Sequence, residues 1–234
     1  MIEILGAHAG VQLALFPELY LTGYQLADLG PIAREAEAQL ERIREAARAA
    51  GAGVVVGAAL PTAGGGVSNS ALCISAAGEL VGRYDKTQLF GAEREVFEPG
   101  NEVVLAQMGA IRVAPLICFD LEFPSPARIA ARAGADLLVV ISANMRPYHR
   151  DHRVFCEARA LENRLPLAYV NRVGRESGFI FVGGSRLVGG DGRAYVQMSA
   201  SREQVGVFQL VVAQAVPSEV DYLSQSRDDL EVRM

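Results

Sequence analysis

The sequence has none of the long apolar runs that a membrane helix requires. No stretch approaches the roughly 20 consecutive apolar residues that span a bilayer. The first residues, MIEILG, lack the basic segment and apolar core that mark a secretory signal peptide. Cysteine is also scarce, because only Cys73, Cys118 and Cys156 are present. An odd, scattered set does not make a disulfide framework, so we expect a cytoplasmic protein without a membrane partner.

A surplus of basic charge is missing as well. The formal net charge is -5 and the sequence pI is about 5.3, whereas a nucleic-acid-binding domain needs a basic face. The densest charge run, residues 35–48, mixes both signs at helical spacing and indicates a solvated helix face. We therefore expect no nucleic-acid partner.

The low number of histidines limits metal binding. His149 and His152 form an H-x-x-H pair, but a metal site needs three or more convergent ligands and only His8 remains. We interpret the pair as part of a solvated helix start. The glycines at 51, 53 and 57 miss the dinucleotide-binding pattern, because the third glycine comes one residue late. We expect neither a metal nor a cofactor.

Short apolar runs separated by turn residues and helical segments predict an α/β chain. Strands are expected at residues 11–16, 53–60, 69–74, 80–84, 102–107, 111–118, 136–142, 167–171, 178–188, 194–197 and 206–212. Helices are expected at residues 31–50, 126–133 and about 150–163. Residues 86–100 lack a clear period and are interpreted as a long surface loop. Without repeats or linkers, we expect one domain over residues 1–234, with a polar tail from about 217.

Three chemically useful side chains each follow a predicted strand. Glu18 lies just past the first strand, Lys86 just past the strand at 80–84, and Cys118 ends the strand at 111–118. In α/β sheets, ligands collect beyond the carboxyl ends of strands, so these groups can converge on one pocket. A thiol needs a base to become a good nucleophile, and a carboxylate can serve as that base. A lysine and the backbone N–H of Phe119 can then hold a developing oxyanion.

The local sequences around these residues form a recognisable set. They read FPELYLTGY at 16–24, YDKTQLF at 84–90 and LICFDLEFP at 116–124, followed by ARALEN at 158–163 and Asn171. In content and order they closely resemble the signatures of the nitrilase superfamily of carbon–nitrogen hydrolases. The resemblance extends from about residue 10 to residue 212, which is most of the chain.

The resemblance implies a fold and a set of roles. It implies a four-layer α-β-β-α sandwich of two mixed sheets that self-associates as a homodimer or larger homo-oligomer through helices next to the active site. It implies Glu18 as general base, Lys86 as stabiliser of the oxyanion, and Cys118 as the nucleophile that forms a thioester. The family pattern E-x-x-x-F-x-P-G selects Glu93 as the support of the lysine, with Glu95 as the alternative if the loop register differs.

Two departures from the family pattern stand out. Gln88 replaces the histidine that usually follows two residues after the lysine. We expect residues 1–9 to supply only the end of the helix that precedes the glutamate strand, and the first strand of the family fold to be absent. We expect either an unpaired sheet edge or another segment that fills it.

Further residues receive weaker assignments. Cys73 and Cys156 lie in apolar segments and are interpreted as core residues. Glu122 is equally compatible with a helix-start charge and with a pocket residue. Candidate substrate-binding residues are Tyr24, Glu122, Asn144 and Tyr148.

The expected reaction is hydrolysis of a small linear non-peptide amide to a carboxylate and ammonia, as in the aliphatic and ω-amino amide branch that the motifs resemble most. The alternative within the family is hydrolysis of N-carbamoyl amines or amino acids, and nitrile hydrolysis is less favoured. A different class of function is a catalytically weak homologue that binds a metabolite or a partner protein. The short N-terminus motivates this reading, and the intact Glu18, Lys86 and Cys118 argue against it.

Overall fold

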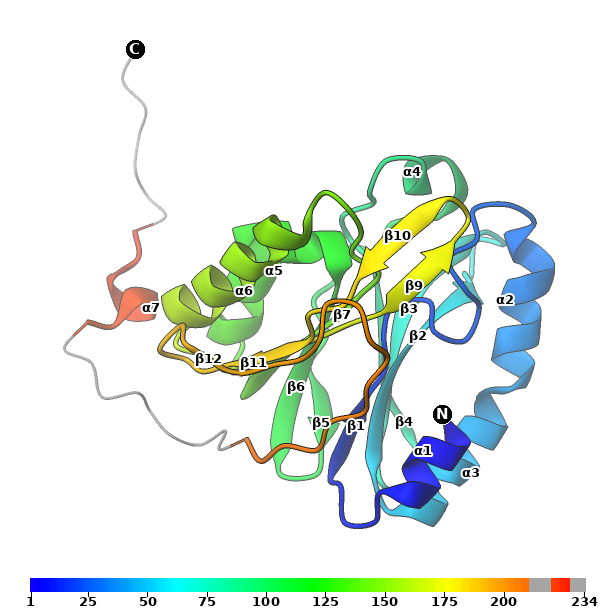
Figure 1. Cartoon of the computed structure of the whole chain (residues 1–234), viewed down its shortest axis with the longest axis horizontal. Helices are drawn as coiled ribbons and strands as arrows, with labels where there is room; N and C mark the ends of the chain where they lie inside the picture. The colour runs from blue at the N-terminus through cyan, green and yellow to red at the C-terminus, as the bar shows by residue number, and fades with distance from the viewer. Residues whose placement is uncertain (211–219, 228–234) are drawn as a thin grey trace.

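The computed structural model describes residues 1–210 and 220–227, which form two stacked sheets between two layers of helices (Figure 1). One outer layer consists of α1 (Ile2–Ala7), α2 (Leu29–Ala38) and α3 (Leu40–Ala50). The other outer layer consists of α5 (Pro124–Arg132) and α6 (His149–Asn163). The predicted four-layer sandwich is confirmed.

The first sheet has the strand order β1-β2-β3-β4. Its strands are β1 (Leu13–Leu15), β2 (Gly53–Pro61), β3 (Val67–Ile74) and β4 (Leu80–Asp85). The β1 and β2 strands are parallel, while the remaining pairs are antiparallel. Within the described residues β1 pairs only with β2, so this is where the expected unpaired edge lies.

The second sheet has the order β12-β11-β8-β7-β6-β5. Its strands are β5 (Ala106–Met108), β6 (Ile111–Ile117), β7 (Leu137–Ser142), β8 (Leu167–Asn171), β11 (Arg186–Val188) and β12 (Ala194–Gln197). The β6, β7 and β8 strands are parallel, so their carboxyl ends meet at one edge. This sheet is therefore mixed, as expected.

The main core fills the space between the sheets. Apolar side chains such as Val55 and Cys73 from the first sheet join Leu116 and Val140 from the second in one buried cluster. A second cluster, including Ile43 and Ala47, joins the first sheet to its outer helices. The two sheets are thereby held in a fixed relation, which matters because residues at the ends of strands from both sheets meet in one site.

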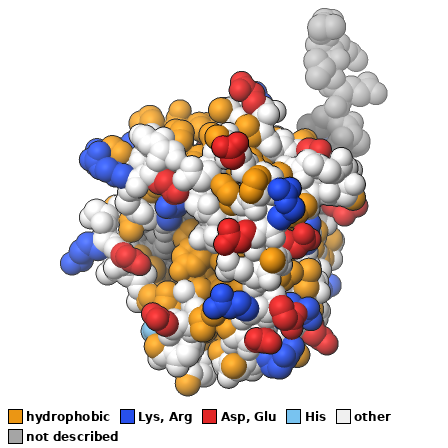
Figure 2. All heavy atoms as spheres, turned by 90° about the vertical axis from the view of Figure 1, so that its right-hand side faces the viewer, with side chains coloured by type: hydrophobic (Ala, Val, Ile, Leu, Met, Phe, Trp, Pro, Cys, Tyr) orange, Lys and Arg blue, Asp and Glu red, His pale blue; other side chains and the backbone are white. Residues whose placement is uncertain are grey.

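The expected helix over residues 31–50 is in fact two helices, α2 and α3. Gln39 ends the first and precedes the second. The break lets α2 pack on β2 while α3 packs against α1. The outer face of this helical layer carries acidic and basic side chains side by side (Figure 2). Glu41 and Arg44 on α3 form one ion pair of opposite charges, 2.9 Å apart.

The late strands also differ from the expectation. The segment predicted as one strand at 178–188 contains β10 (Phe179–Val182) and then β11, because Gly183 and Gly184 both adopt positive φ and turn the chain. The β10 strand instead forms a separate hairpin with β9 (Val173–Glu176), which sequence patterning missed. The expected strand at 102–107 is mostly irregular, with only β5 at its end. Residues 206–210 form no strand, while 211–212 lie outside the described residues.

The expected tail is described only in part. Residues 220–227 contain the short helix α7 (Tyr222–Gln225), whose amino end is capped by Asp221. Arg164 lies over the Tyr222 ring, 4.8 Å from its centroid. Residues 217–219 and 228–234 of the predicted tail lie outside the described residues. No helix in the described part of the chain is long and apolar enough to cross a membrane.

Candidate active site

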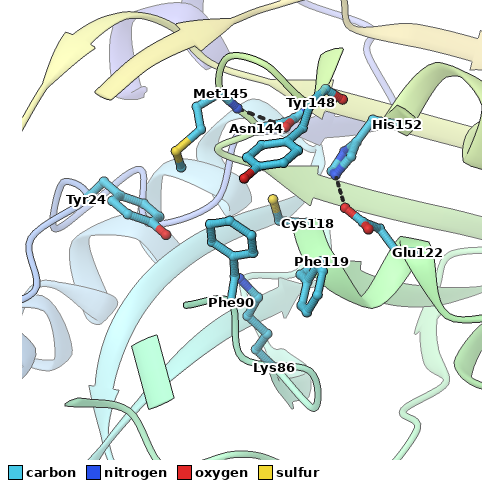
Figure 3. A pocket seen from close by; sticks show the side chains of 10 residues that line it. All are labelled: Tyr24, Lys86, Phe90, Cys118, Phe119, Glu122, Asn144, Met145, Tyr148 and His152. Carbon is cyan, nitrogen blue, oxygen red and sulfur yellow. Dashed lines mark hydrogen bonds and ion pairs between the residues drawn. The ribbon is translucent and has the colours of Figure 1, made fainter. Parts of the chain in front are cut away.

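A narrow pocket opens where strand ends from both sheets meet (Figure 3). It is lined by Tyr24, Lys86, Phe90, Cys118, Phe119, Glu122, Asn144, Met145, Tyr148 and His152. Lys86 follows β4 of the first sheet, and Cys118 follows β6 of the second. The predicted convergence of strand-end residues therefore occurs.

Lys86 lies between two buried carboxylates. Its Nζ is 2.7 Å from Glu18 Oε1 and 2.8 Å from Glu93 Oε2, and all three side chains are at most 1% exposed. Burial lowers the pKa of Lys86, but the charges of Glu18 and Glu93 outweigh this effect. The pKa of Lys86 is therefore raised well above its ordinary value. The lysine is therefore a cation fixed in position by both acids.

Glu18 is held by donors on both carboxylate oxygens. Oε1 accepts hydrogen bonds from Lys86 and from Asn69 Nδ2 at 2.7 Å, and Oε2 accepts from the backbone N–H of Ala143 at 2.7 Å. Burial raises the pKa of Glu18 above its usual range, and the charge of Lys86 opposes the rise. A carboxylate with a raised pKa is a stronger base than an exposed one, which suits it to take a proton from a thiol.

Cys118 occupies a strained turn at the end of β6. It starts the 3₁₀ helix η1 (Cys118–Glu122) and has φ of 46°, a left-handed conformation that a non-glycine residue adopts at a cost of about 1–3 kcal/mol. Burial, followed by the charge of Glu18, raises the pKa of the Cys118 thiol well above its ordinary value. The resting group is therefore a thiol that needs a neighbouring base.

Asp120 holds this turn against the lysine loop. Its Oδ2 accepts from the Ile117 N–H at 3.0 Å and from Tyr84 Oη at 2.8 Å. Its Oδ1 accepts from the backbone and hydroxyl of Thr87 and from the Gln88 N–H at 2.8 Å. One buried carboxylate thus connects the turn at Cys118 with the segment after Lys86. Sequence reasoning quoted Asp120 within a motif but gave it no role.

The loop at 86–100 is not simply a surface loop, as the sequence suggested. It contains the short helix α4 (Glu93–Val96), and the Glu93 side chain is fully buried against Lys86. Tyr24 donates its hydroxyl to Glu93 Oε1 at 2.8 Å. Glu95 is exposed, so the family register that selects Glu93 matches the contact with Lys86.

Aromatic rings form much of the pocket wall. Phe90 makes edge-to-face contacts with Phe119 and with Tyr148, at centroid distances of 5.3 and 5.5 Å. Asn144 Oδ1 accepts from the Met145 N–H at 2.8 Å, so its side chain is fixed at the pocket. The predicted substrate-binding positions therefore all line this pocket.

The interpretation of His152 as part of a solvated helix start was wrong. Its ring is buried, because α6 turns it toward the pocket and β8. Nε2 lies 3.4 Å from Glu122 Oε1, which settles that Glu122 faces the pocket, and Nδ1 lies 3.0 Å from Tyr169 Oη. His149 is exposed. In the described part of the chain, no three metal-ligating side chains come together.

Several polar residues near the site escaped sequence reasoning. They are Asn69, Asp120, Ser142, His152 and Tyr169, all of them buried. The available signal was polar residues in a strand that is expected to be buried, such as Asn69 between Ser68 and Ser70 in β3. Both other cysteines, Cys73 and Cys156, are buried core residues as predicted.

Comparison with known proteins agrees with the fold and the site described above. A sequence model described as carbon-nitrogen hydrolase matches residues 1–218. The chain belongs to the carbon–nitrogen hydrolase family, the nitrilase superfamily. A curated relative, the (R)-stereoselective amidase of a Pseudomonas species, is 36% identical over 221 residues, covering 92% of this chain and 79% of the relative.

Solved structures of family members agree in fold and in chemistry. An amidase from a Nesterenkonia species superposes with a TM-score of 0.77 at 33% identity, covering 82% of this chain and 74% of that one. A mutant of the Nesterenkonia amidase in complex with butyramide gives a TM-score of 0.79 at 32% identity, covering 86% and 79%. This carbon–nitrogen hydrolase therefore has an amidase-like fold, and its relatives support cysteine-dependent amide hydrolysis.

Proposed function

We propose that this hydrolase converts a small linear amide to a carboxylate and ammonia through a thioester on Cys118. The observation that carries the proposal is the buried ion cluster in which Lys86 bridges Glu18 and Glu93 beside the pocket that contains Cys118. A base, a cation and a thiol in one enclosed pocket are the groups that acyl transfer requires.

The first half of the reaction forms the thioester. Glu18 takes the proton of the Cys118 thiol, and the sulfur attacks the amide carbon. Lys86 and the N–H of Phe119 stabilise the negative charge on the oxygen, since both belong to residues that line the pocket. The carbon–nitrogen bond breaks, and the nitrogen leaves as ammonia with the proton from Glu18.

The second half restores the enzyme. Glu18 takes a proton from water, and the resulting hydroxide attacks the thioester carbon. The carbon–sulfur bond breaks, the carboxylic acid leaves, and Glu18 returns its proton to sulfur. Glu18 suits this double duty because both its oxygens are fixed by hydrogen bonds.

The pocket wall favours a short acyl group with apolar character. Phe90, Phe119 and Tyr148 present ring surfaces, and Glu122 adds a carboxylate to the lining. The Nesterenkonia relative bound to butyramide supports an aliphatic acyl chain. An ω-amino group at the chain end would meet Glu122, so ω-amino amides belong to the same proposal.

The decisive assay is ammonia release over plain aliphatic amides, ω-amino amides, N-carbamoyl amines and nitriles, with Cys118→Ala as the control. We expect release from amides and none from the Cys118→Ala variant. Turnover that survives in the folded variant contradicts the proposal. Release only from N-carbamoyl amines moves the assignment to the alternative branch.

A single domain over residues 1–234 and a cytoplasmic location remain parts of this proposal.

A further inference from the structure

The sulfur of Cys118 has a polar neighbour that the proposed mechanism does not use. The register of the parallel strands pairs Ile117 with Ile141, so Cys118 and Ser142 emerge side by side at the ends of β6 and β7. The Ser142 hydroxyl contributes to lowering the pKa of the Cys118 thiol, against the larger effect of burial, which is the effect of a donor beside the sulfur. Ser142 is fully buried, so no solvent competes for its hydroxyl.

The hydrogen bonds around Ser142 determine where its own proton points. The oxygen accepts from the backbone N–H of Asn144 at 3.1 Å and from the hydroxyl of Tyr169 at 3.2 Å. A serine hydroxyl has two acceptor positions and one proton. Since both acceptor positions are filled, the proton remains for the Cys118 sulfur.

The same reasoning extends one residue further from the sulfur. Tyr169 gives its proton to Ser142, so its oxygen acts as an acceptor toward the Nδ1 of His152, 3.0 Å away. Nδ1 must then carry a proton. Glu122 lies against the other ring nitrogen at 3.4 Å and fixes the orientation of the imidazole (Figure 3).

We propose that His152 is a positioning residue that acts through Tyr169 and Ser142 to direct a hydroxyl proton at the sulfur of Cys118. This chain of donors stabilises the thiolate on the side of the sulfur served by β7 and β8. Lys86 and Glu18 reach the site from the ends of β4 and β1. The proposal rests on the proposed role of Cys118 as the nucleophile.

The test measures the rate at which iodoacetamide alkylates Cys118 as a function of pH, followed by mass spectrometry of the labelled peptide. Titratable or charged groups around the sulfur are Glu18, Tyr24, Lys86, Glu93 and Tyr169, and the pocket also brings Glu122 and His152 to it. The variants are Tyr169→Phe, Ser142→Ala and His152→Leu, all of which leave Glu18, Tyr24, Lys86, Glu93 and Glu122 in place. His149→Asn is the matched control, because this exposed histidine lies on the same helix.

We expect each of the three variants to raise the pH midpoint of alkylation by about one unit, the size of one lost hydrogen bond to a charged group. The rate constant kcat falls about tenfold, while KM changes little. In His152→Asn we expect most of the loss seen in His152→Leu to be absent, because the side-chain N–H of asparagine occupies the position of Nδ1. The His149→Asn control matches the wild type. Tyr169→Phe added to Ser142→Ala has little further effect, because both act through one hydroxyl.

Two results overturn the inference. One is an unchanged midpoint in folded Tyr169→Phe and Ser142→Ala proteins. The other is full additivity of those two substitutions, which means that Tyr169 acts by another route. Folding is checked in the same experiment, because Cys73 and Cys156 are buried and become labelled only when the protein opens. Turnover that survives in Cys118→Ala rejects the proposed function instead, and the alkylation midpoints separate the two failures.

Discussion

The Nζ of Lys86 lies 2.7 Å from Oε1 of Glu18, and both side chains are excluded from solvent. Removing one partner of a buried ion pair leaves an uncompensated charge, which typically costs about 3–5 kcal/mol. The pair therefore ties the stability of the fold to the proposed chemistry. Substitutions at the site must keep the shape of the side chain if an effect on catalysis is to be separated from an effect on folding.

Glu18→Gln tests the proposed base with minimal change of shape. The amide oxygen still accepts a hydrogen bond, but the group cannot take a proton from Cys118. We expect kcat to fall by about 10²–10⁴-fold, the usual contribution of a general base. Steady-state ammonia release measures the loss, and circular dichroism confirms the fold. Glu95→Gln is the control, because it makes the same chemical change at an exposed glutamate near the site. A Glu18→Gln variant with normal kcat contradicts the assignment.

The sequence was sufficient to predict the residues that sit next to the strand ends, and the reason is local. Glu18, Lys86 and Cys118 each follow a strand and lie in motifs that resemble those of the nitrilase superfamily, so their convergence on one pocket could be expected. Glu93 was selected because residues 93–100 match the family pattern E-x-x-x-F-x-P-G, with Glu95 kept as the alternative.

Contacts that depend on three elements at once were not predictable. His152 reaches Tyr169 only because α6 packs on β8, and Tyr169 reaches Ser142 only because β7 and β8 are parallel in one register. Nothing in the local sequence around His152 distinguishes a buried ring from a solvated one. The break at Gln39 was missed for a related reason, since packing against different neighbours separates α2 from α3.

The three cysteines are expected to differ in reactivity. Burial raises the pKa of Cys73 and of Cys156 to about 12, and neither side chain is exposed. Burial raises the pKa of Cys118 as well, but this side chain borders the pocket and has both a base and a cation beside it. Iodoacetamide at neutral pH should therefore label Cys118 far faster than the other two. Equal, slow labelling of all three in the native protein would favour the weak-homologue reading.

Asp120→Asn should destabilise the protein more than an ordinary surface change. Both oxygens of Asp120 accept hydrogen bonds from several donors, and an amide group would place N–H groups against some of those donors. Each buried donor left without a partner costs about 1–3 kcal/mol, so we expect a loss of roughly 2–4 kcal/mol. Thermal and urea unfolding measure the change. Asp151→Asn, an exposed aspartate at the start of α6, should leave the stability within experimental error.

Self-association should involve the helices beside the site. Ile129 on α5 and Val154 and Leu161 on α6 are large apolar side chains that are 38–52% exposed. Exposed apolar residues on neighbouring helices are typical of protein interfaces. We expect a homo-oligomer in light scattering after gel filtration, and a shift to monomer in Val154→Glu. Substitutions to Lys or Glu on the outer face of α3, which already carries charged side chains, serve as controls. A wild-type protein that is monomeric at high concentration contradicts this prediction.

The pH dependence of turnover should reveal the coupling between Glu18 and Glu93. The proposed mechanism requires ionised Glu18, so kcat/KM falls as the pH drops through the pKa of that carboxyl. The charge of Glu93 contributes to raising this pKa. In Glu93→Gln the charge is gone, so the pKa of Glu18 falls and the acidic limb of the profile moves to lower pH. The maximal kcat also falls, because Lys86 loses one of its two anchors. Tyr24→Phe keeps the charge and should leave the acidic limb near its wild-type position, whereas a shift to higher pH in Glu93→Gln would contradict the coupling.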